Sequence, residues 1–173
     1  MIKAMISGSD RSLAMALSEF GEQAGVKIIS ENVVVPNELC CETVNFYGAF
    51  NLATLAACAA IDRVPAGDVF VGRQSVLLRN DRSWRHLISV QIVDRFQTLL
   101  CGTWTATVSV PRNLADMVRS RGTSASNLEA VLTDLYGQED VDPYCRLSGG
   151  RTRQQLFVEA LLKVPNRRWL TRF

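Results

Sequence analysis

Histidine is the side chain that most often acts in acid–base catalysis, and this sequence has only one, His86. One imidazole excludes a metal site built from several histidines and any mechanism that needs two. His86 could still activate a distant serine or cysteine, because such partners meet in space rather than in sequence. A single histidine beside Trp84 and Arg85 is more typical of a surface or edge-strand position. We therefore expect His86 on the surface and keep it only as a minor catalytic candidate.

The cysteines indicate neither a zinc site nor a disulfide framework. Their number is odd and no two are spaced as Cys-x-x-Cys, the spacing that structural zinc sites use. We expect reduced thiols, buried as small hydrophobes where the neighbours are apolar. The sequence thus predicts no metal and no cofactor. The five are Cys40, Cys41, Cys58, Cys101 and Cys145.

Positive charge is concentrated at the carboxyl-terminal end of the chain. Residues 146–173 hold seven basic residues against Glu159 alone, a net charge of +6. The rest of the chain holds 12 basic and 16 acidic residues, or −4, which gives the total of +2. An acidic body with a basic end suggests an anionic partner. Arginines outnumber lysines 16 to 3, and guanidinium groups suit bidentate phosphate contacts.

Two segments combine arginines with a tryptophan. Guanidinium groups attract phosphate, and an indole face can stack on an unpaired base. We predict contact with RNA, DNA or an acidic protein surface through these segments and the basic tail. The alternative is that each tryptophan packs onto the domain while the arginines are solvated. The predicted contact residues are Arg79, Arg82, Trp84, Arg85, Arg151, Arg153, Arg167, Arg168, Trp169 and Arg172.

The elements that must position these residues begin with a β-α-β unit. Apolar residues alternate over 2–6, which predicts a strand, and they repeat with helical spacing from Leu13 to Ala24, which predicts a helix. The β-branched residues over 26–35 predict a second strand. A helix between two strands favours parallel pairing. The segment 7–11 could hold a phosphate on its backbone amides, but we expect a helix start capped by Ser9 or Asp10.

A long helix over 42–61 is apolar on nearly all sides, so we expect a sheet or a second subunit to cover it all round. Strands are predicted over 68–78, 86–96 and 98–110, with a polar loop over 80–85; the second of these also fits a helix. Helical segments follow Pro111, with Ser124 or Ser126 and then Thr152 as caps of later helices.

These elements predict an α/β (α+β) fold. It has a β-α-β start, a long apolar central helix against a mixed sheet of about five strands, and a helical C-terminal region. We place a core domain over 1–110 and a helical extension over 111–173, packed on the core and ending in the basic tail 146–173. No apolar run is long enough to span a bilayer, and no secretory signal is recognisable, so a cytoplasmic protein is expected.

A long helix followed by three antiparallel strands resembles the hot-dog fold of acyl thioesterases, over residues 26–110. That resemblance implies Glu42 or Asn45 orienting a water molecule for thioester hydrolysis. The β-α-β start is also similar to small phosphate-recognition modules of the BRCT type. It would place 7–11 at an anion-binding helix start.

From the missing catalytic motifs and the basic end, we expect a non-enzymatic binding or assembly protein. It would be a homodimer formed over the 42–61 helix, with the tail contacting the anionic partner. Deletion of 163–173 is then expected to leave the fold intact. The alternatives are a hot-dog-type thioesterase and a structural component of a viral or phage particle.

Overall fold

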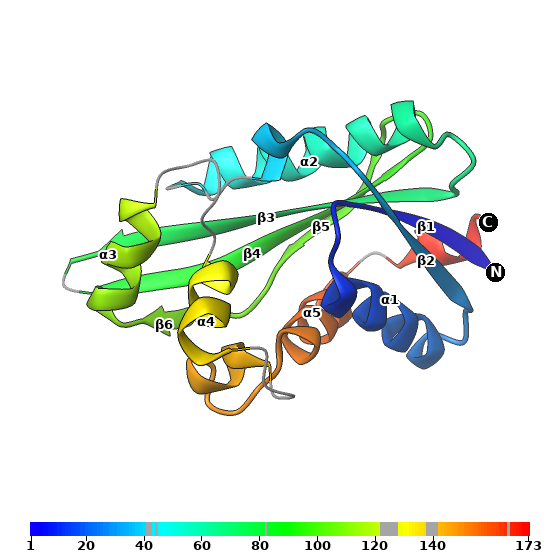
Figure 1. The fold of residues 1–173 in the computed structure, drawn as a ribbon. Helices are drawn as coiled ribbons and strands as arrows, with labels where there is room; N and C mark the ends of the chain where they lie inside the picture. The colour runs from blue at the N-terminus through cyan, green and yellow to red at the C-terminus, as the bar shows by residue number, and fades with distance from the viewer. Residues whose placement is uncertain (41–42, 44, 82, 122–127, 138–141, 166) are drawn as a thin grey trace.

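A computed structural model describes residues 1–40, 43, 45–81, 83–121, 128–137, 142–165 and 167–173. Within them, six strands form one mixed sheet (Figure 1). Five of them have the order β2-β1-β3-β4-β5, and the sixth, β6, pairs with the first residues of β4, on the same edge as β5. The strands are β1 Ile2–Ser7, β2 Ile28–Val33, β3 Val69–Asn80, β4 Ser83–Asp94, β5 Leu99–Trp104 and β6 Val108–Val110. The helices are α1 Arg11–Gln23, α2 Phe46–Arg63, α3 Arg112–Ser120, α4 Leu128–Tyr136 and α5 Arg153–Leu162. The 3₁₀ helices are η1 Asn37–Cys40, η2 Pro143–Arg146 and η3 Arg168–Thr171.

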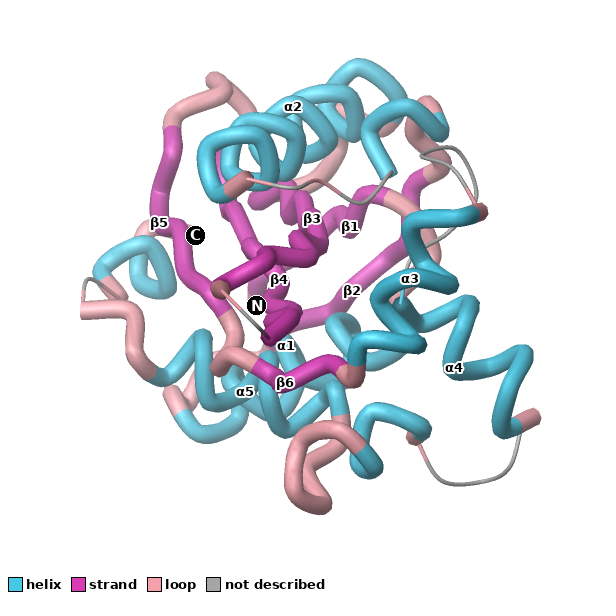
Figure 2. Tube along the Cα trace, turned by 90° about the vertical axis from the view of Figure 1, so that its left-hand side faces the viewer, coloured by secondary structure: helices cyan, strands magenta, loops and turns pink. Residues whose placement is uncertain are grey.

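The predicted α/β class is confirmed, including its β-α-β start. Strand β1 pairs in parallel with β2, and α1 connects the two strands. On its other side, β1 pairs in parallel with β3. The remaining pairs are antiparallel. Helix α2 covers one face of the sheet, whereas α1 and α5 lie on the other (Figures 1 and 2). Residues 86–94 of the ambiguous segment 86–96 belong to strand β4, in agreement with their high content of β-branched residues.

The main core lies between the sheet and the α1–α5 layer. Phe20 from α1, Val90 from β4 and Phe157 from α5 are buried in one cluster. The C-terminal segment belongs to it as well, because Trp169 is only 3 % exposed and its ring stacks on Phe20 at 6.2 Å between centroids. Deleting 163–173 would therefore open the core, contrary to the expectation from sequence. Among the described residues, α5 and η3 thus contribute to the same buried cluster as α1 and the sheet.

The side chains that helix α2 buries against the sheet are all alanines. The residues it buries are Ala49, Ala53, Ala56, Ala57 and Ala60. They sit close to the strands because Gly72 of β3 has no side chain: a Cβ there would lie 1.7 Å from the Ala53 carbonyl oxygen. The opposite side of α2 exposes Tyr47 and Leu55. Within this chain the helix is thus covered on one side, so a sheet that wraps it is excluded, and cover by a second subunit stays a prediction.

Three predicted boundaries differ from the structure. Helix α2 begins at Phe46 rather than at 42, because Asn45 caps it and accepts a hydrogen bond from the Gly48 amide at 2.6 Å. The polar loop predicted over 80–85 is a tight turn at Asp81 (φ 47°), and β4 begins at Ser83. The single strand predicted over 98–110 is two strands, β5 and β6, and the break between them contains Thr105.

The two resemblances from sequence do not describe this sheet. Three antiparallel strands do follow α2, as in a hot-dog fold, but β1 and β2 extend the sheet in parallel and helices cover its second face. The sheet therefore does not wrap α2. A small β-α-β-β module would lack the long helix α2 between its second and third strands. No helix in the described ranges is long and apolar enough to cross a membrane.

Candidate anion-binding site

The far end of the β3–β4 hairpin positions two of the predicted contact residues. Arg79 and Trp84 are direct cross-strand partners in the antiparallel register. Side chains directly opposite each other project from the same face of a sheet, so the guanidinium and the indole are neighbours. On its other side, β4 pairs Trp84 with Val110 of β6, and the chain then passes through Pro111 into α3. The hairpin thereby places Trp84 next to the start of a helix.

Helix α3 contributes a charged stripe to the same region. Arg112, Asp116 and Arg119 are spaced i, i+4 and i+7, which places them on one side of a helix. The opposite side buries Leu114 and Val118 in an apolar cluster, against which Trp84 also packs. Burial of that side fixes the rotation of α3, so its charged stripe faces outward beside the indole.

Together these residues line a pocket of about 360 Å³. We call it the basic pocket, and its lining residues are Arg79, Asp81, Trp84, Arg112, Asp116 and Arg119. The Arg119 guanidinium lies over the Trp84 ring, 5.3 Å from the centroid, which is the geometry of a cation–π contact. Three guanidinium groups and two carboxylates give the pocket a net charge of +1.

The guanidinium groups of the basic pocket are held only loosely by its carboxylates. Asp116 lies 3.7 Å from Arg112 and 4.0 Å from Arg119, and all three side chains are more than half exposed. Exposed ion pairs of this kind contribute about 0–1 kcal/mol. Arg79 and Asp81 form no ion pair with any described residue. The arginines are therefore available to an incoming anion.

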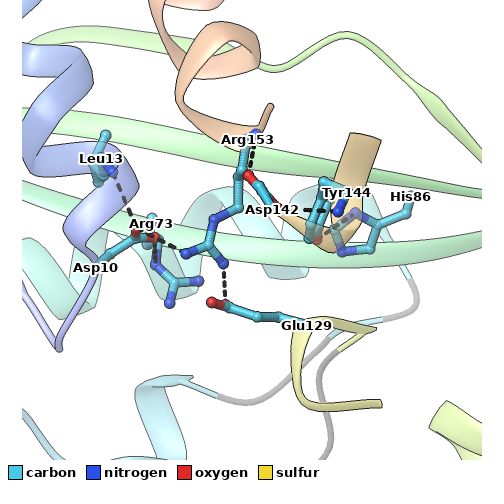
Figure 3. Close-up of polar contacts among 8 residues, drawn as sticks. All are labelled: Asp10, Leu13, Arg73, His86, Glu129, Asp142, Tyr144 and Arg153. Atoms are coloured by element: carbon cyan, nitrogen blue, oxygen red, sulfur yellow. Dashed lines mark hydrogen bonds and ion pairs between the residues drawn. The ribbon is translucent and has the colours of Figure 1, made fainter. Parts of the chain in front are cut away.

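Arg153 of the basic tail is not on the surface; its side chain is 8 % exposed. It lies in a charge cluster with Asp10, Arg73 and Glu129, shown with its neighbours in Figure 3. One terminal nitrogen lies 3.2 Å from Asp10 and the other pairs with Glu129. Burial opposes the charged form of Arg153, but the Asp10 and Glu129 carboxylates outweigh that effect and raise the pKa of the guanidinium. Arg153 is thus neutralised by the body of the protein.

Asp10 joins the charge cluster to the start of α1. Its side chain accepts a hydrogen bond from the Leu13 amide at 3.0 Å and lies 2.5 Å from the Nε of Arg73 (Figure 3). The helix cap predicted at Ser9 or Asp10 is therefore Asp10. Because its carboxylate occupies the first turn of α1, the capped helix start describes this segment better than a phosphate site does.

The other tail residues divide between internal contacts and the surface. Arg151 pairs with Glu159 at 3.0 Å, and the Arg167 guanidinium lies 5.7 Å from the Phe20 ring centroid. Trp169, being buried, offers no face to a base, so the alternative of a tryptophan packed on the domain holds here. Arg168 and Arg172 are exposed. The C-terminal end of the tail and the end of the hairpin where β3 passes into β4 lie at opposite ends of the molecule, so they do not form one surface (Figure 1).

The catalytic candidates are not brought together in the described residues. His86 was expected on the surface, but it is 1 % exposed on β4, and its Nδ1 lies 3.3 Å from the Tyr144 hydroxyl. Asn45 is occupied as the cap of α2. Glu42 and Arg82 lie outside the described residues. Arg85 is exposed and follows Trp84 directly on β4, so it points to the opposite face of the sheet from the basic pocket.

Sequence reasoning missed Arg112 and Arg119, although a signal for both was present. Charged residues at 112, 116 and 119 repeat with helical spacing directly after Pro111, and leucine and valine fill the positions between them. What the sequence could not show is that this helix lies beside Trp84. Within the described ranges, no three histidine, cysteine or acidic side chains are grouped as a metal site would require.

Comparisons with known proteins define the fold and nothing finer. No family model matches the chain, and no curated protein matches it. Among solved structures, the chain is similar to one described as the crystal structure of protein VC0702 from Vibrio cholerae. The TM-score is 0.70 at 17 % sequence identity, over 94 % of this chain and 92 % of that one. The chain therefore shares the α/β fold of VC0702 over nearly its whole length.

Proposed function

We propose that this protein is a non-enzymatic binding protein that engages an anionic partner through the basic pocket. The observation that carries the proposal is the pocket itself, where three arginines from a hairpin and a helix converge beside a half-buried indole. This moves the proposed contact away from the C-terminal tail, because Arg153 and Arg151 are paired internally and Trp169 is buried. Of the residues predicted from sequence, Arg79 and Trp84 stay in the proposed site.

Charge favours this location over the tail. The three arginines are paired loosely or not at all with described carboxylates, so an anion need not first separate a strong ion pair. Each phosphate or sulfate that they neutralise releases counterions, which makes such binding weaken as the salt concentration rises. A carboxylate-rich protein surface would respond to salt in the same direction.

Elution from an immobilised polyanion tests the proposal. Heparin is suitable because it carries dense negative charge and no bases. The double variant Arg112→Gln/Arg119→Gln should elute at a clearly lower salt concentration than the wild-type protein. The matched control Arg168→Gln/Arg172→Gln removes the same charge from the exposed tail and should shift elution much less. If the tail variant eluted at a lower salt concentration than the pocket variant, the pocket would be refuted as the contact surface.

Self-association is a second proposal, favoured by the exposed side of α2. Tyr47 is 85 % and Leu55 is 54 % exposed on a helix whose other side is fully buried. A homodimer formed over this side would remove both from water. Light scattering should then report a dimer that Tyr47→Glu/Leu55→Glu converts to a monomer. A monomeric wild-type protein at the same concentrations would contradict this proposal.

A further inference from the structure

We infer that the basic pocket binds one nucleotide unit of an unpaired nucleic-acid strand. This inference rests on the proposed function and narrows its partner from any polyanion to single-stranded RNA or DNA. The reasons are the layered Trp84 and Arg119 groups, the two carboxylates among the arginines, and the dimensions of the pocket.

The first reason is the pair of flat groups in the pocket wall. The Arg119 guanidinium lies over the Trp84 indole at 5.3 Å, and an unpaired base stacks both on aromatic rings and on guanidinium planes. A base can add to the outer side of Arg119 or replace it over the ring. In a duplex the faces of the bases are already stacked, so a double strand cannot use either position.

The second reason is that the pocket offers acceptors as well as donors. Asp81 and Asp116 would weaken the binding of a ligand made only of phosphate or sulfate groups, because they repel its charge and offer it no donor. A base carries amino groups at its edge, and carboxylates accept hydrogen bonds from those of cytosine and adenine. Asp81 forms no ion pair or hydrogen bond with any residue that the structure describes, so its carboxylate is free to accept one. Arg79 and Arg112 then remain for the flanking phosphates.

The third reason is size. A volume of about 360 Å³ lies near the lower end of the pockets that enclose small ligands, roughly 300–1,000 Å³. This is room for one base and its sugar. Its lining residues come from the turn end of the β3–β4 hairpin and from α3, two elements that lie at one end of the molecule (Figure 1). A free nucleotide would fill the same space but would lack the second phosphate contact.

The inference is tested by comparing four ligands on the intact protein. Fluorescence anisotropy would measure the Kd of a labelled 12-nucleotide oligo(dA), whose bases carry the amino groups that the argument requires, and the Kd of its duplex with oligo(dT). Inorganic polyphosphate and deoxyadenosine monophosphate, the free nucleotide, would be measured in competition. We expect the single strand to bind at least ten times more tightly than the duplex. Stacking of one base contributes about 1–3 kcal/mol, so Trp84→Leu should reduce the preference for the strand over polyphosphate by about 5- to 150-fold.

Arg119→Lys is the matched variant that keeps the positive charge and removes the flat guanidinium. It should also lower the preference for the strand over polyphosphate, and it avoids any loss of packing that Trp84→Leu causes. Equal affinity for strand, duplex and polyphosphate would overturn the inference while leaving a general polyanion site in place. Equal affinity for deoxyadenosine monophosphate and the strand would overturn the claim that a polymer is the ligand. Failure to bind any of the four would overturn the proposed function as well.

Discussion

Replacing Asp10 with asparagine should destabilise the protein strongly without disturbing the start of α1. Asparagine has nearly the same shape as aspartate, and its carbonyl oxygen can still accept the hydrogen bond from the Leu13 amide. What the substitution removes is the negative charge between Arg73 and Arg153. The charge cluster then holds two guanidinium groups against Glu129 alone.

The magnitude follows from how deeply each charge is buried. Removing one partner of a buried ion pair costs about 3–5 kcal/mol, because the remaining charge is left uncompensated. Here Arg153 keeps Glu129, and the Arg73 side chain is 19 % exposed, so water compensates part of its charge. We therefore expect a loss of about 3 kcal/mol in the free energy of unfolding, at the lower end of that range.

Urea unfolding followed by circular dichroism would measure this loss. The matched control is Glu31→Gln, which breaks the exposed Lys3–Glu31 pair at 3.1 Å and should cost about 0–1 kcal/mol. The double variant Asp10→Asn/Arg153→Met should lose less than the sum of the two single variants, because both act on one interaction. A cost for Asp10→Asn no larger than that for Glu31→Gln would refute the reasoning.

Three further predictions concern packing and protonation. Gly72→Ala should lower the free energy of unfolding in urea by about 3 kcal/mol or more, because the new Cβ would overlap the Ala53 carbonyl and push α2 off the sheet. An unchanged free energy of unfolding would contradict that close contact. Trp169→Ala should cost about 3–5 kcal/mol in the same assay through loss of a buried ring, and an effect below 1 kcal/mol would place the C-terminal segment outside the core. Burial raises the pKa of the Cys101 thiol from 9.0 to about 12, so folded Cys101 keeps a proton that the unfolded chain releases. Stability should fall from about pH 9 to 12, and Cys101→Ala should make that fall smaller; an identical pH dependence in both proteins would contradict the pKa shift.

The fold class could be predicted from the sequence because the alternation, helical spacing and capping residues of neighbouring segments indicate the same arrangement. Alternation in β1 and helical spacing in α1 predict a β-α-β unit, and the structure confirms its parallel pairing. The helix starts were readable where a capping residue is present, as at Thr152 before α5. The break at Thr105 was not readable, because a threonine-rich run has high strand propensity on both sides of it.

Only half of the candidate site could be predicted from the sequence. Arg79 and Trp84 are close in sequence and share a hairpin, so their combination could be recognised directly. Arg112 and Arg119 reach the same pocket only through the packing of α3, a contact between elements that sequence spacing does not reveal. For the same reason, sequence reasoning counted Arg153 among the surface charges. Its partners Asp10 and Glu129 are distant along the chain, and nothing local marks them as neighbours.

The length of the β3–β4 hairpin has a consequence for recognition. Its two strands pair over twelve residues each, from Val69 opposite Asp94 to Asn80 opposite Ser83. One end of this ladder lies in the main core and the other carries Arg79 and Trp84. The backbone that carries those two side chains is thereby fixed by the scaffold, so binding at the proposed site would cost little backbone entropy. We expect a rigid docking event, in which the bound and free backbones superpose closely at the hairpin.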